Sequence, residues 1–216
     1  QDHRNACAAL YSGVCQTDLF QARARSFSST LEQALAEDHV PVEVVENLIE
    51  SAREGADPLR RYPRLRREVL GIESYDLYDS LLPLLDEDLV YPYDQAVELV
   101  TASVAPMGED YCALMREAVE GRWIDVYEGD GKRGGAYSAS VYGVHPYLLL
   151  NYNDTLGSVF TLAHELGHCL HSMLASESQP FVYARYSIFV AEVASTLGEA
   201  LLLDHLLKQT EDPAQR

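Results

Sequence analysis

The chain has 216 residues, of which 47% are hydrophobic and 23% charged, a composition typical of a globular protein with one sizeable core or two small ones. Its 34 acidic and 16 basic residues leave a formal net charge of −18, and this acidic excess argues against nucleic acid as a partner. Charged residues or histidine interrupt the apolar stretches before they could cross a bilayer, so we expect a soluble protein with no membrane partner.

Residues 1–85 are predicted to form a helical segment. Leucine and valine recur among good helix formers over residues 8–35, and a second helix is expected to begin at Pro41. A third helix should run over residues 58–70 and end at Gly71. Its arginines form the one basic cluster of the chain, which we interpret as a solvated helix face.

Residues 86–216 are predicted to contain helices and a small sheet, beginning with a loop over residues 86–94. The hydrophobic period predicts four helices, at residues 95–105, 109–120, 155–174 and 186–207. Alternation predicts three strands, at residues 123–127, 136–142 and 147–152. The last two helices share a short connection, so they should pack as antiparallel or steeply crossed neighbours. The predicted fold class is therefore mostly α with a small β-sheet.

The four cysteines are scattered along the chain without CxxC spacing: Cys7, Cys15, Cys112 and Cys169. This spacing argues against a cysteine zinc site and against a disulfide framework, so we expect reduced thiols and a cytoplasmic protein. The sequence starts at Gln1 with neither an initiator methionine nor a signal peptide, and we therefore expect a piece of a longer protein.

The sequence HELGH occupies residues 164–168, inside the first of the two long helices. Because a helix turns about 100° per residue, His164 and His168 project from one face and can share a metal ion. Imidazole suits zinc, which in catalytic sites has three protein ligands and one water. Glu165 is placed to take the proton of that water as it attacks a carbonyl. The pattern predicts one Zn²⁺ per chain and peptide-bond hydrolysis; the alternative is a helix with two surface or capped histidines.

Four residues near this motif are candidates for the third ligand: His171, Glu177, Glu192 and Glu199. His171 lies about 10 Å along the helix axis from the first histidine, which favours a neighbour over a ligand. Glu177 falls in a stretch of serine, glutamine and proline, where a solvated carboxylate is expected.

Glu192 lies among apolar and small residues of the last helix, where an unpaired charge is costly and coordination to zinc would offset the cost. The alternative is a partly exposed glutamate, or one paired with Arg185. Glu199 lies seven residues further on the same face, and it fits either an acceptor for the second N–H of a ligating histidine or a solvent-facing carboxylate.

Several segments resemble one peptidase family. LAHELGH at residues 162–168, followed by AEVAST at residues 191–196, resembles the two zinc-binding helices of the M3 metallopeptidases, in their oligopeptidase F branch. The segments YDLY at residues 75–78, GKRGGAYS at 131–138 and HPYLLLNY at 145–152 resemble the same branch. The resemblance is clear from about residue 70 to residue 207.

The resemblance implies a zincin-like metallopeptidase catalytic region, with residues 86–216 as its zinc-binding part and Glu192 at the position of the glutamate ligand. It implies a zinc endopeptidase that cuts short unstructured peptides inside a deep channel. The edge of the sheet along which substrate lies extended would be formed by Gly134, Gly135, Ala136 and Tyr137, and glycines suit such close backbone approach. The alternative is a glycine-rich hairpin turn with Tyr137 in the core.

The chain also departs from the family, whose members run to several hundred residues. In the family, tyrosines and a histidine further along the chain help to bind substrate and stabilise the oxyanion, and no stretch here stands in for them. We therefore expect a chain that binds zinc but hydrolyses peptides poorly, and whose uncovered apolar surface favours self-association or binding of the missing remainder. Two alternatives stay open: a catalytically incompetent zinc-binding fragment or binding module, and a metal-free helical interaction protein.

Overall fold

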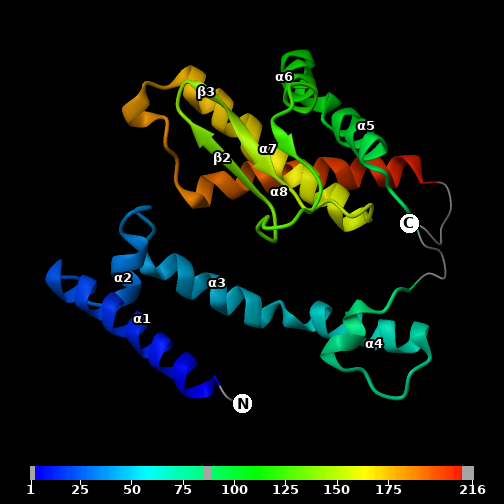
Figure 1. Cartoon of the computed structure of the whole chain (residues 1–216). Helices are drawn as coiled ribbons and strands as arrows, with labels where there is room; N and C mark the ends of the chain where they lie inside the picture. The colour runs from blue at the N-terminus through cyan, green and yellow to red at the C-terminus, as the bar shows by residue number, and fades with distance from the viewer. Residues whose placement is uncertain (1–2, 85–88, 211–216) are drawn as a thin grey trace. The chain divides into compact units, whose positions relative to one another are not determined.

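A computed structural model describes residues 3–84 and 89–210. The chain divides into two units, Gln1–Leu84 and Leu85–Arg216, and each is described by itself. The labels and colours of Figure 1 identify their helices and strands.

The first unit is helical. Its elements are α1 (Arg4–Ala24), α2 (Thr30–Leu35), α3 (Val42–Glu54), α4 (Ala56–Leu70) and the short 3₁₀ helix η1 (Leu77–Leu81). Gly71 ends α4 in the left-handed conformation, as the sequence predicts. The prediction of one helical stretch over residues 8–35 is wrong, because Ser29 caps a new helix by accepting a hydrogen bond from the Glu32 amide at 3.0 Å.

The second unit contains the remaining helices and a small sheet. Its elements are α5 (Tyr93–Ser103), η2 (Ala105–Met107), α6 (Glu109–Glu120), β1 (Ile124–Asp125), β2 (Tyr137–Val141), β3 (Val144–Leu149), α7 (Leu156–Ser178), η3 (Phe181–Tyr183) and α8 (Ile188–Gln209). Of the predicted loop over residues 86–94, residues 86–88 lie outside the described residues, and α5 already begins at Tyr93. Helix α7 runs past Leu174, the predicted end, so Glu177 lies in its last turn.

The three strands form one sheet in the order β1-β3-β2, with β1 parallel and β2 antiparallel to β3. Strand β2 is therefore an edge strand. The third strand begins at Val144 and not at the predicted Tyr147, because Gly143 adopts a positive φ of 79° and turns the chain directly after β2.

The core of the second unit lies around α7. This helix packs against β2, β3 and α8, and also contacts α5 and α6 (Figure 1). Leu148 of β3 and Leu170 of α7 are buried in one continuous hydrophobic cluster with Met115 of α6 and Leu202 of α8. The prediction of a mostly helical fold with a small sheet is confirmed. Among the described helices, none has the length and hydropathy needed to span a bilayer.

Candidate metal centre

The histidine-bearing helix α7 starts at a threonine cap, where Thr155 Oγ1 accepts a hydrogen bond from the Ser158 amide at 3.2 Å. Three buried leucines at a spacing of four form its core face: Leu162, Leu166 and Leu170. His164 and His168 each follow a leucine by two residues, about 160° round the helix. The pattern of the helix thus directs both imidazoles away from the leucine face.

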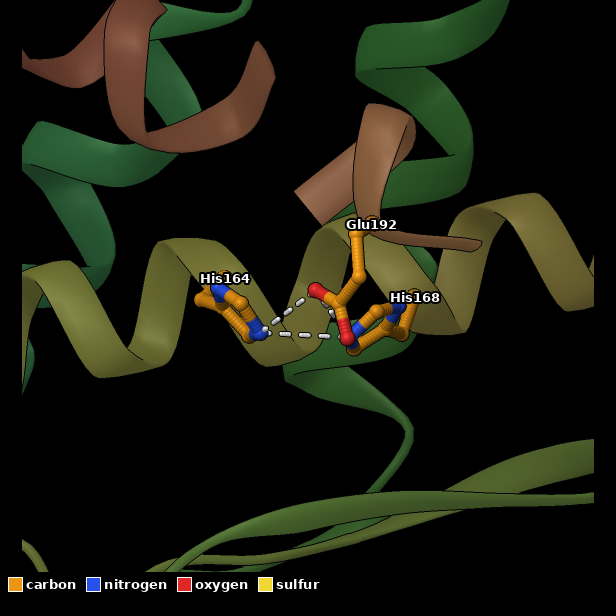
Figure 2. Close-up of side chains that lie close together, drawn as sticks. All are labelled: His164, His168 and Glu192. Atoms are coloured by element: carbon orange, nitrogen blue, oxygen red, sulfur yellow. Dashed lines mark hydrogen bonds and ion pairs between the residues drawn. The ribbon is translucent and has the colours of Figure 1, made fainter. Parts of the chain in front are cut away.

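Glu192 of α8 completes a cluster with the two histidines (Figure 2). The Nε2 atoms of His164 and His168 lie 3.1 Å apart. Glu192 Oε2 lies 3.6 Å from the Nε2 atom of His164 and 3.7 Å from that of His168. Among the described residues, these three form the one group of metal-ligating side chains whose donor atoms converge.

The donor atoms have the separations that a zinc ion requires. Three atoms at 3.1, 3.6 and 3.7 Å from one another share a point about 2 Å from each, close to the usual zinc–nitrogen and zinc–oxygen distances. Two imidazole nitrogens and one carboxylate oxygen are also a donor set found in catalytic zinc sites. The residues present therefore fit zinc.

Two further side chains hold the cluster in place. Glu199 Oε1 lies 2.6 Å from Nδ1 of His164, so this carboxylate accepts the hydrogen bond if the imidazole carries its proton on Nδ1. Ser195, which is fully buried, donates a hydrogen bond from Oγ to Glu192 Oε2 at 2.8 Å. The hydrogen bond to Glu199 leaves the lone pair of His164 Nε2 free to bind a metal ion. The hydrogen bond from Ser195 fixes Oε2 of Glu192.

Glu192 itself is less buried than the sequence argument assumed. Its side chain is 48% exposed, and Phe189 and Val193 on the same helix are exposed as well. The structure brings Glu192 to the histidines, and no ion pair joins it to Arg185 in the described part of the chain.

Glu165 is buried. At about 100° per residue it lies about 60° round α7 from both His168 and Leu162, between the histidines and the leucine face. Burial raises the pKa of the Glu165 carboxyl and the nearby Glu192 adds to the rise, whereas His164 and the backbone of Ser138 on β2 lower it. One carboxylate oxygen, Oε2, is buried with no hydrogen-bond partner. A carboxyl with a raised pKa and a free oxygen is suited to accept and release a proton.

The predicted peptide-binding segment lies at the edge of the sheet. Tyr137 is the first residue of β2, and Gly134, Gly135 and Ala136 lead into it. Asn151 holds this approach by donating hydrogen bonds from Nδ2 to the carbonyl oxygens of Arg133, at 2.9 Å, and Gly135, at 2.8 Å. The alternative that places Tyr137 in the core is wrong, because its side chain is exposed.

Comparison with known proteins places the chain in a family. The sequence profile of Peptidase family M3 matches residues 1–216. The chain belongs to peptidase family M3. This confirms the resemblance drawn from the HELGH and AEVAST segments.

Relatives of this M3 chain are named oligopeptidases. Oligopeptidase PepF of Bacillus subtilis is 42% identical over 215 residues, which cover 99% of this chain and 32% of PepF. Group B oligopeptidase PepB of Streptococcus agalactiae is 40% identical over 210 residues, covering 95% of this chain and 35% of PepB. A solved structure from Chlamydophila abortus is 36% identical with a TM-score of 0.79, covering 99% of this chain and 36% of that one. The M3 chain thus spans about a third of the length of these relatives.

Two of the sequence candidates lie outside the cluster of the M3 chain. His171 does not join the converging donor atoms; its ring stacks on Tyr186 with 3.8 Å between centroids, and burial lowers its pKa. Glu177 is exposed in the last turn of α7.

Sequence reasoning missed Ser195 and Asn151 as supports of the M3 site. A signal for Ser195 is present, since it lies three residues after Glu192 on the same helix and within reach of its carboxylate. No local signal marks Asn151, because its partners lie 16 and 18 residues away in the sequence.

Proposed function

We propose that this chain is the zinc-binding part of an oligopeptidase that hydrolyses short unstructured peptides, with His164, His168 and Glu192 as ligands and Glu165 as general base. The observation that carries the proposal is the convergence of three donor atoms at separations that fit zinc. Family membership supports it, because metal-dependent peptide hydrolysis is consistent with the oligopeptidase names of the relatives.

The side chains have distinct roles in this proposal. Bound zinc would supply a Lewis acid and lower the pKa of a coordinated water. Glu165 takes up a proton at its free Oε2 and passes it on, a role that its raised pKa supports. Glu199 keeps a proton on Nδ1 of His164, so that Nε2 faces the other donor atoms with its lone pair.

A peptide would bind in extended form along β2. This strand is at the edge of the sheet, so its outer backbone groups are open to pairing with another chain in the described part of the structure. Gly134 and Gly135 carry no side chain that would obstruct the peptide, and Asn151 fixes their backbone. Folded proteins lack the free extended strand that this edge requires, which favours short unstructured peptides as substrates.

A second function, zinc binding without turnover, is favoured by the length of the chain. It spans about a third of the length of its relatives, and their names describe the activity of the longer proteins. The free thiols of all four cysteines support a reducing compartment, and we place the protein in the cytoplasm on that ground.

Zinc content and peptide hydrolysis, measured on the same preparation, test the proposal. We expect about one zinc per chain on protein purified without chelator, and cleavage of an internally quenched unstructured peptide that Glu165→Gln abolishes without loss of zinc. Zinc binding with no cleavage by the parent chain would select the second function. Absence of zinc after dialysis against zinc at neutral pH would contradict both.

A further inference from the structure

Two glycines lie where α7 and α8 contact each other. A Cβ atom built on Gly167 of α7 would lie 2.8 Å from the carbonyl oxygen of Ala194 and 2.8 Å from Cα of Ser195. A Cβ atom on Gly198 of α8 would lie 2.9 Å from the carbonyl oxygen of Ala163. All three obstructing atoms belong to the backbone, so they cannot rotate out of the way. A side chain at either glycine would therefore force the two helices apart.

The contact at Gly198 adjoins the pair of His164 and Glu199. Ala163 directly precedes the histidine and Gly198 directly precedes the glutamate. The backbone contact between these neighbours accompanies the 2.6 Å approach of Nδ1 to Oε1. The length of that hydrogen bond therefore depends on how closely the helices meet at Gly198.

The contact at Gly167 adjoins the pair of His168 and Glu192 in the same manner. Gly167 directly precedes the histidine, and its contact on α8, at Ala194 and Ser195, lies within one turn of the glutamate. Ser195 donates its hydroxyl to Glu192 Oε2 at 2.8 Å. The glutamate carboxylate is thus tied to the stretch of α8 that Gly167 touches.

An alanine at Gly167 would displace the helices by more than a metal site tolerates. A Cβ makes ordinary van der Waals contact at 3.4 Å or more, so an alanine at Gly167 requires a shift of about 0.6 Å. Metal–ligand distances tolerate only about 0.2 Å. Side-chain rotation of Glu192 offers limited relief, because the buried Ser195 hydroxyl holds its oxygen.

We infer that Gly167 and Gly198 are positioning residues of the metal centre, which set the distance between the ligands of α7 and those of α8 by letting the two backbones touch. The inference rests on the proposed zinc site. It assigns the glycine of the HELGH segment a function in metal binding, in addition to its place in the helix.

The test compares Gly167→Ala and Gly198→Ala with Gly157→Ala in the full chain. Gly157 is also in α7, but a Cβ there meets only Thr155 Oγ1, at an ordinary 3.7 Å. Zinc affinity is measured by competition with a chromophoric chelator, and ligand geometry by the visible absorption of the Co²⁺ form. We expect zinc affinity to fall about tenfold or more in the two contact variants, with an altered Co²⁺ spectrum, and to stay at the parent value in Gly157→Ala.

A double-mutant cycle separates positioning from general destabilisation. If Gly198 acts through the bond between Glu199 and His164, then Gly198→Ala and Glu199→Gln together should cost less affinity than the product of their separate effects. Fully multiplicative effects, or contact variants that bind zinc and Co²⁺ like the parent, would overturn the inference. So would contact variants that fail to fold with and without zinc, since the glycines would then serve packing alone. Loss of zinc binding in the parent chain would instead overturn the proposed function.

Discussion

The two units of the chain differ in how they bury their apolar side chains. In the first unit, only Ala22 and Arg66 are buried among the described residues, while Leu10 of α1 is 73% exposed. In the second unit, one continuous cluster joins helices α5 to α8 with the sheet, and Leu162 and Leu202 are fully buried. Helices gain most of their stability from packing an apolar face. The second unit therefore supports its own helices, whereas the first unit buries too few side chains to support its helices in this way.

The largest expected contrast is in cysteine reactivity. Cys7 and Cys15 on α1 are exposed, whereas Cys112 and Cys169 are buried in the second unit, where burial raises the pKa of the Cys169 thiol to about 12. If a buried thiol reacts only when the unit opens, an opening cost of about 5 kcal/mol slows its reaction by more than about a thousandfold. We expect two fast thiols with Ellman's reagent at pH 8 and all four in denaturant. Replacing Cys7 and Cys15 by serine should remove the fast phase; four fast thiols in the native chain would contradict the contrast.

Truncation of a leucine should affect the two units very differently. Leu202→Ala removes a fully buried side chain of α8 and should lower the free energy of unfolding by about 2–5 kcal/mol. Leu10→Ala, and the control Leu203→Ala at a half-exposed position next to the core residue, should each stay within about 0.5 kcal/mol. Urea unfolding is followed by the fluorescence of Trp123, the single and buried tryptophan, for the second unit, and by far-UV circular dichroism for the helices of the first. Equal losses at Leu10 and Leu202 would show that the first unit has a core of comparable strength.

Removal of zinc should likewise destabilise only the second unit. At a zinc concentration a hundredfold above its dissociation constant, binding contributes about 3 kcal/mol. A chelator should therefore shift the unfolding midpoint seen by Trp123 fluorescence to lower urea, and His168→Ala should abolish that shift. Far-UV circular dichroism should in addition show an early loss of helix, from the first unit, that the chelator leaves unchanged. A chelator that moved both phases equally would mean that the units unfold together.

The features that the sequence predicted correctly are local ones. The spacing of His164 and His168 is fixed by a single helix, so their shared face follows from helix geometry alone. The carboxylate of Glu192 stands out in the sequence among apolar neighbours, and it does lie beside the histidines. Its burial does not follow from those neighbours, because the glutamate is half-exposed and its place depends on how α8 packs against α7.

What the sequence did not reveal depends on contacts between distant segments. Gly167 meets the backbone of α8 at a residue 27 or 28 positions away, and Asn151 bonds to carbonyls across the sheet. The sequence predicts the start of β3 at Tyr147 and not at Val144 for a related reason. The turn at Gly143 sets the register of the whole hairpin, and that turn depends on the pairing of two strands. Period and composition describe one element at a time, so they do not specify these pairings.

The smallest expected effect is a pH dependence carried by His171 in the second unit. Burial lowers its pKa from the ordinary value of 6.5, so the unfolded chain binds this proton more tightly than the folded one. The folded state is therefore favoured above pH 6.5 and loses that advantage as the pH falls through 6.5 toward the lowered value.

The test measures the free energy of unfolding of metal-free protein by Trp123 fluorescence. We expect it to fall more between pH 7.5 and pH 5.5 in the parent than in His171→Gln. The slope against pH is compared, and not the absolute value. His39→Gln provides the control, because His39 lies in the first unit and Trp123, whose fluorescence is followed, lies in the second. Parallel slopes in the parent and in His171→Gln would mean that water reaches the ring, and that the core around α7 is more open at this end than its buried leucines indicate.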